Sequence, residues 1–236
     1  MIKMMFLLLI LLNISFARKS SLHNLHTLNQ KKYSNYLSDP LMPVVIAYGP
    51  AGTGKTLLAC QNAIKEYQNN NIDKIIITRP IISVGEELGF LPGTINEKMD
   101  PWTRPIFDIF REYYSEKNLK DMIRDNILEI SPISFMRGRT YTKSFIIADE
   151  MQNSSPKQMV MLTTRLGIDS KLVITGDLQQ CDLNTSENGL KDLLKRLKFH
   201  EPSYIEEEEP FIGIVELDNN DIKRSPIVTK MINVYR

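Results

Sequence analysis

The chain has 236 residues, of which 42% are hydrophobic and 24% are charged, so it is long enough for one well-buried α/β domain but short for two. The formal net charge of +1 excludes a general positive field for nucleic acid, so a polyanion would need a local basic patch. The two cysteines lack metal-type spacing and do not indicate a disulfide framework.

The first 40 residues differ from the rest. Lys3, an apolar run over residues 4–12 and small residues at 15–17 form the layout of a signal or targeting segment over residues 1–17. The apolar run is too short to span a bilayer in the mature protein. The alternative is an unprocessed apolar start. Residues 18–40 are polar and basic and are predicted to form an N-terminal arm, so the domain itself is placed at 41–236.

A strand, a glycine-rich turn, a helix and a second strand follow in order. Residues 44–48 form an apolar run typical of a buried parallel strand, and residues 57–67 have apolar positions at helical spacing. The run at 74–78, stopped by Pro80, predicts the next strand. Such a unit requires a right-handed crossover and a parallel sheet.

The remaining chain continues this alternation after an insertion. Residues 83–126 begin with glycine and proline and continue as a helical, aromatic-rich stretch. The later strands are predicted at 127–130, 144–148, 171–175 and 211–217, and the later helices at 156–166, at 189–198 and from 225 onward. The fold class is therefore α/β, with a doubly wound, mostly parallel sheet and a helical insertion.

The glycine-rich turn matches the phosphate-binding pattern G-x-x-x-x-G-K-[ST] between a strand and a helix. Glycines allow successive backbone N–H groups to point at phosphate oxygens, and the following helix adds its positive dipole end. Lys55 is expected to reach the outer phosphates, and Thr56 to give its hydroxyl to Mg²⁺. The loop predicts ATP binding by Gly49, Pro50, Ala51, Gly52, Thr53, Gly54, Lys55 and Thr56.

Polar side chains follow two of the later strands. Asp149 and Glu150 come directly after the strand at 144–148, and Gln180 comes shortly after the strand at 171–175. Ligands of such sheets bind at the carboxyl ends of the strands. Asp149 is predicted to hold Mg²⁺, Glu150 to deprotonate the attacking water, and Gln180 to sense the γ-phosphate.

Motifs beyond the loop resemble those of the PhoH family, ATPases related to superfamily 1 helicases. They are Thr78–Pro80, Gly85–Glu86, Gly89–Gly93, Phe135–Thr140, Ile147–Asn153, Thr164–Gly167 and Thr175–Asp177. The resemblance covers about Asn29 to Tyr235. It implies a RecA-like core of the P-loop NTPase class, ATP hydrolysis with Mg²⁺, and ring-like homo-oligomers such as hexamers. It also implies RNA helicase activity in some relatives.

Two more residues match the family pattern. Gln30 lies in an upstream segment where a glutamine is expected to read the adenine edge, and the alternative is a polar residue of the arm. Arg224 matches a late arginine expected to stabilise transition-state charge, in cis or from a neighbouring subunit. The alternative for Arg224 is a surface ion pair near a helix start.

The resemblance implies coupling to RNA or another single-stranded nucleic acid, and a site that follows such a backbone needs positive charge. The candidate contacts are Arg79, Arg137, Arg139 and Arg165.

Two other functions stay open, namely an ATP-dependent switch or assembly protein without unwinding and a small-molecule P-loop kinase. Glu150 beside Asp149 favours hydrolysis over the kinase. Since an ATPase needs ATP, the protein is expected inside the cell, in the cytoplasm or in an organelle if residues 1–17 are a targeting segment.

Overall fold

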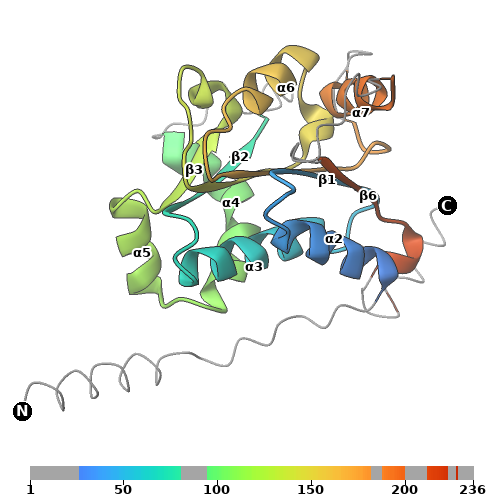
Figure 1. Ribbon diagram of the computed structural model, residues 1–236. Helices are drawn as coiled ribbons and strands as arrows, with labels where there is room; N and C mark the ends of the chain where they lie inside the picture. The colour runs from blue at the N-terminus through green and yellow to red at the C-terminus, as the bar shows by residue number, and fades with distance from the viewer. Residues whose placement is uncertain (1–26, 81–94, 182–187, 200–211, 223–226, 228–236) are drawn as a thin grey trace, which may run out of the picture.

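Six parallel strands form a single sheet with helices on both faces (Figure 1). The computed structural model describes residues 27–80, 95–181, 188–199, 212–222 and 227. This arrangement confirms the predicted α/β class, and every pairing in the sheet is parallel.

The strand order is β3-β2-β4-β5-β1-β6. The strands are β1 (Val44–Tyr48), β2 (Lys74–Arg79), β3 (Leu128–Pro132), β4 (Ser144–Ala148), β5 (Lys171–Gly176) and β6 (Ile212–Glu216). All six lie within two residues of the predicted boundaries. Because β1, β5 and β4 are neighbours, the segments that follow them emerge side by side at one edge of the sheet.

Alternate residues of each central strand face opposite layers. Ile75 and Ile77 join the cluster beneath the first group of helices, whereas Ile76 joins the cluster on the other face. Burial on both faces explains why these strands read as continuous apolar runs. The first face carries α2 (Leu28–Ser38), α3 (Lys55–Gln68), α4 (Ile95–Arg111) and α5 (Glu116–Arg124), and the second carries α6 (Pro156–Thr163) and α7 (Gly189–Phe199).

The predicted helical insertion contains α4 and α5. Phe110 is fully buried and Leu119 is 2% exposed, and both belong to the same hydrophobic cluster as α3. The helices of this insertion therefore cover the sheet rather than standing apart from it. The glycine- and proline-rich start of the insertion, residues 81–94, lies outside the described residues.

Helix α2 lies within the stretch that the sequence predicts to be a polar arm. Tyr33 is fully buried and Leu37 is 1% exposed, and both pack into the main core. These two residues are four positions apart and so share one face of the helix. The packed part of the chain therefore begins before residue 41. The candidate targeting segment, residues 1–17, lies outside the described residues.

The C-terminal end of α2 is held by a lysine from the sheet. The Lys171 ammonium group donates to the backbone carbonyls of Tyr36, Leu37 and Asp39 at 3.1, 2.8 and 2.7 Å. The last carbonyls of a helix have no partner within the helix, and a cation there also opposes the negative end of the helix dipole. Lys171 therefore fixes α2 against β5.

Substituting Lys171→Met is expected to lower the free energy of unfolding by about 1–3 kcal/mol, because it removes charge-assisted hydrogen bonds from partly buried carbonyls. Urea denaturation followed by circular dichroism measures the change. Lys74→Met, at the exposed start of β2, is the matched control and should have little effect. An equal loss of stability in the two variants would contradict the role given to Lys171.

Within the described ranges, no helix combines the length and the apolar character needed to cross a lipid bilayer.

Candidate active site

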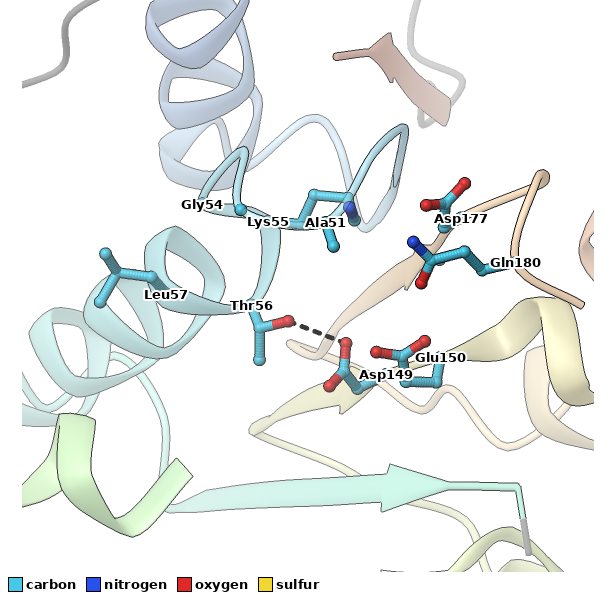
Figure 2. Close-up of a pocket in the computed structure, with 11 residues that line it drawn as sticks. Ala51, Gly54, Lys55, Thr56, Leu57, Asp149, Glu150, Asp177 and Gln180 are labelled. Carbon is cyan, nitrogen blue, oxygen red and sulfur yellow. Dashed lines mark hydrogen bonds between the residues drawn. The ribbon is translucent and has the colours of Figure 1, made fainter. Parts of the chain in front are cut away.

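The candidate site is a pocket at the carboxyl ends of β1, β4 and β5. It is lined by Ala51, Gly52, Gly54, Lys55, Thr56, Leu57, Asp149, Glu150, Gly176, Asp177 and Gln180. The predicted loop, the acidic pair and the predicted sensor glutamine thus surround one cavity (Figure 2).

Two glycines of the loop are required by its geometry. Gly54 precedes α3 with φ +89°, a left-handed conformation that side chains disfavour. A Cβ on Gly49 would lie 2.0 Å from the carbonyl oxygen of Leu217, so the loop packs directly on the end of β6. The loop is also tied to β5, because the Gly49 N–H donates to the Gly176 carbonyl at 3.1 Å. These contacts hold the loop over the sheet.

Lys55 folds back onto the loop in this structure. Its ammonium group donates to the carbonyls of Gly49 and Pro50 at 2.6 and 2.8 Å. Burial lowers the pKa of Lys55, while the nearby carboxylates, led by Asp177, act in the opposite direction. The charge therefore lies among groups that a phosphate could replace as partners.

Side chains of helix α2 contact the backbone of the phosphate loop. The Gln30 side-chain amide donates to the carbonyls of Thr53 and Asp221, each at 3.1 Å, and the Tyr33 hydroxyl donates to the Lys55 carbonyl at 3.2 Å. Gln30 is buried at 6% exposure. The structure thus places Gln30 against the phosphate loop, and its reading of an adenine edge stays a prediction.

Asp149 accepts hydrogen bonds from two threonines through one oxygen. The hydroxyl of Thr56 lies 2.8 Å from Asp149 Oδ1, and the hydroxyl of Thr175 donates to the same atom (Figure 2 shows the first contact). Asp149 is 8% exposed. The two residues predicted to serve Mg²⁺ are therefore in direct contact. No role was predicted for Thr175, because its contact with Asp149 depends on β4 and β5 being neighbours.

Glu150 is held from two sides. The Arg79 guanidinium lies 3.2 Å from Glu150 Oε1, and the side-chain amide of Gln152 donates to Oε2. Glu150 itself has φ +55°, a left-handed conformation that is uncommon for a residue with a side chain. Backbone strain of this kind persists where surrounding contacts fix it, and it is frequent at active sites.

Gln152 connects Glu150 to the next strand end. Its side-chain oxygen accepts the backbone N–H of Asp177 at 3.0 Å, and the residue is 1% exposed. Asp177 begins the loop that carries Gln180, whose side chain extends over the pocket beside Glu150 (Figure 2). From the sequence, Gln152 was only part of a family motif. Its position between Glu150 and Asp177 became apparent from the side-chain contacts.

The other predicted residues are placed differently. Arg139 forms a two-pronged ion pair with Glu129 and lies over the Tyr141 ring at 4.7 Å. Arg165 donates to the carbonyls of Met161 and Arg139 at 3.1 and 3.2 Å. Both arginines thus have partners within the fold, whereas Arg137 is exposed. Nucleic-acid contact by these arginines stays a prediction, and Arg224 lies outside the described residues.

Comparison with known proteins decides the family. The family model described as "PhoH-like protein" matches residues 24–236. The chain belongs to the PhoH family. A PhoH-like protein of Bacillus subtilis (strain 168) is 42% identical over 196 residues, which are 81% of this chain and 58% of that protein. Protein PhoH of Escherichia coli (strain K12) is 36% identical over 195 residues, covering 81% of this chain and 52% of its own.

This PhoH-family chain therefore spans little more than half the length of these two relatives. A crystal structure of Bacteroides Pif1 bound to ssDNA aligns with 88% of this chain and with 45% of the Pif1 chain. The sequence identity is 17% and the TM-score is 0.39, so this similarity carries no argument about function. Family membership and the parallel sheet confirm the P-loop NTPase fold.

Proposed function

We propose that this chain hydrolyses ATP with Mg²⁺ and that hydrolysis is coupled to single-stranded RNA or a related single-stranded nucleic acid. One observation carries the proposal. Lys55 and Thr56 of the phosphate loop share a pocket with Asp149, Glu150 and Gln180. A phosphate-binding loop alone serves many reactions. A carboxylate beside the loop that can accept a proton from water favours hydrolysis.

The donor atoms of the pocket suit Mg²⁺. Thr56 and Asp149 supply a hydroxyl and a carboxylate, the hard oxygen ligands that Mg²⁺ prefers, and phosphate oxygens and water complete its shell in nucleotide sites. Among the described residues, no group of three or more His, Cys, Asp and Glu side chains could hold a metal ion. Mg²⁺ bound here would neutralise phosphate charge.

The protein groups divide the remaining work. Lys55 is assigned to the outer phosphates, and Glu150 takes a proton from water as the water oxygen bonds to the γ-phosphorus and ADP leaves. Gln180 is assigned to hold that water or a γ-phosphate oxygen. Gln30 is proposed to contact the adenine from its position against Thr53. Arg224, from this chain or a neighbouring subunit of a ring, is proposed to stabilise the transition state.

Coupling to nucleic acid is the finer part of the proposal. Arg79 and Arg137 offer partly exposed or exposed guanidinium groups, and arginine pairs with phosphate through two parallel hydrogen bonds. These side chains support binding to the phosphate backbone of a single strand rather than recognition of its bases.

The deciding experiment measures ATP hydrolysis by the purified full chain with and without single-stranded poly(U), at several Mg²⁺ concentrations. Lys55→Ala is the control, because loss of its charge should reduce the rate by about 10²-fold or more. Hydrolysis that survives Lys55→Ala would come from a contaminant or another site. A wild-type rate that poly(U) leaves unchanged would refute the coupling while leaving ATP hydrolysis intact.

A further inference from the structure

Each oxygen of the Glu150 carboxylate already has a side-chain partner, one through an ion pair and the other through a hydrogen bond. Arg79 lies 3.2 Å from Oε1, and the Gln152 amide donates to Oε2. Arg79 is the last residue of β2, and Glu150 follows the neighbouring strand β4, so the ion pair connects two strand ends. The residue assigned to accept a proton is therefore restrained by a cation outside the phosphate loop.

The two partners of Glu150 differ in how firmly they are fixed. Gln152 is 1% exposed and also accepts a hydrogen bond from the Asp177 backbone, so its side chain and its contact with Glu150 are fixed by the fold. The Arg79 and Glu150 side chains are 32% and 35% exposed. An ion pair of that exposure is worth about 0–1 kcal/mol, so a competing anion can displace it.

A phosphodiester is a suitable competitor. The planar guanidinium group binds two phosphate oxygens at once, and a single-stranded backbone presents such groups in series. If Arg79 turns to a backbone phosphate, Oε1 of Glu150 loses its cationic partner while Glu150 still lines the pocket. The same side chain can thus contact nucleic acid or restrain Glu150.

We propose that Arg79 is a positioning residue that restrains Glu150 in the resting protein and releases it when it binds a backbone phosphate of single-stranded nucleic acid. The inference rests on the proposed function and specifies how nucleic acid would stimulate hydrolysis. Exchange of Glu150 for phosphate frees the carboxylate to accept the proton of the attacking water.

The test compares the wild type, Arg79→Ala and Arg79→Lys in steady-state ATP hydrolysis, without and with saturating poly(U). Arg79→Ala should raise the basal kcat about 2–5-fold, the factor that corresponds to breaking an exposed ion pair, with KM for ATP unchanged. Its stimulation by poly(U) should fall towards one. Arg79→Lys keeps a charge but not the planar fork and should lie between the two.

Binding provides a second readout that a purely structural role would not change. Arg79→Ala should weaken poly(U) binding and reduce the slope of log K against log salt by about one. Arg124→Ala is the matched control, because Arg124 is an exposed arginine paired with Asp121 and Asp125 on α5. It should leave hydrolysis and binding unchanged.

Each contrary result overturns the proposal at a known point. A lower or unchanged basal kcat in Arg79→Ala would show that Arg79 does not restrain Glu150. Wild-type hydrolysis that is indifferent to poly(U) would overturn the release step, whatever the basal rate of the variant. Absence of hydrolysis that depends on Lys55 would instead refute the proposed function itself.

Discussion

Glu150→Gln is expected to lower kcat for ATP hydrolysis by about 10²–10⁴-fold, the usual contribution of a positioned general base. The amide cannot take a proton from water, yet it has nearly the same shape and can still accept a hydrogen bond from Gln152. ATP affinity should therefore stay close to that of the wild type. Single-turnover hydrolysis and equilibrium binding of a fluorescent ATP analogue separate the two effects.

Glu129→Gln is the control for that experiment. Glu129 is also a partly buried glutamate paired with an arginine, Arg139, but it does not line the pocket. Its substitution should leave kcat unchanged. If Glu150→Gln retained most of the wild-type kcat, another group would have to accept the proton.

Asp149→Asn is expected to reduce hydrolysis at millimolar Mg²⁺ by about 10²–10³-fold, the scale observed when one preorganised electrostatic contact is lost. Asparagine keeps an oxygen that can accept from Thr56 and Thr175, but it lacks the charge that attracts the metal. The Mg²⁺ concentration that gives half-maximal rate should rise. The measurement is hydrolysis across a Mg²⁺ titration.

Thermal melting distinguishes this effect from unfolding. Asp149 is 8% exposed, so removing its charge also removes a desolvation cost, and the melting temperature of Asp149→Asn should not fall. Thr175→Val removes only the supporting hydroxyl and should have a smaller effect, about 10-fold on the Mg²⁺ dependence. An unaltered Mg²⁺ titration in Asp149→Asn would remove this residue from the metal site.

The sheet was predictable because its central strands are buried on both faces, which produces uninterrupted apolar runs such as residues 74–78. The position of Asp149 and Glu150 beside the loop was also predictable, because ligand sites of such sheets lie at strand ends. The structure brings both residues, with Gln180, into the pocket lined by Lys55.

Other features depend on tertiary contacts that no local pattern records. Helix α2 buries only Gln30, Tyr33 and Leu37 among its eleven residues, so its apolar face is too narrow to stand out from a polar segment. The partner of Arg79 was likewise not apparent. A basic side chain at a strand end suggests a nucleic-acid contact. Only the side-chain geometry shows that Arg79 forms an ion pair with Glu150.

The attachment of α2 to the phosphate loop has a mechanical consequence. One helix of eleven residues, about 16 Å long, separates the upstream chain from the end that Lys171 anchors. Gln30, near the start of that helix, is bonded to the Thr53 carbonyl. A force applied to the chain before Leu28 would therefore reach the phosphate loop through the two hydrogen bonds that α2 makes to the loop backbone, those of Gln30 and Tyr33.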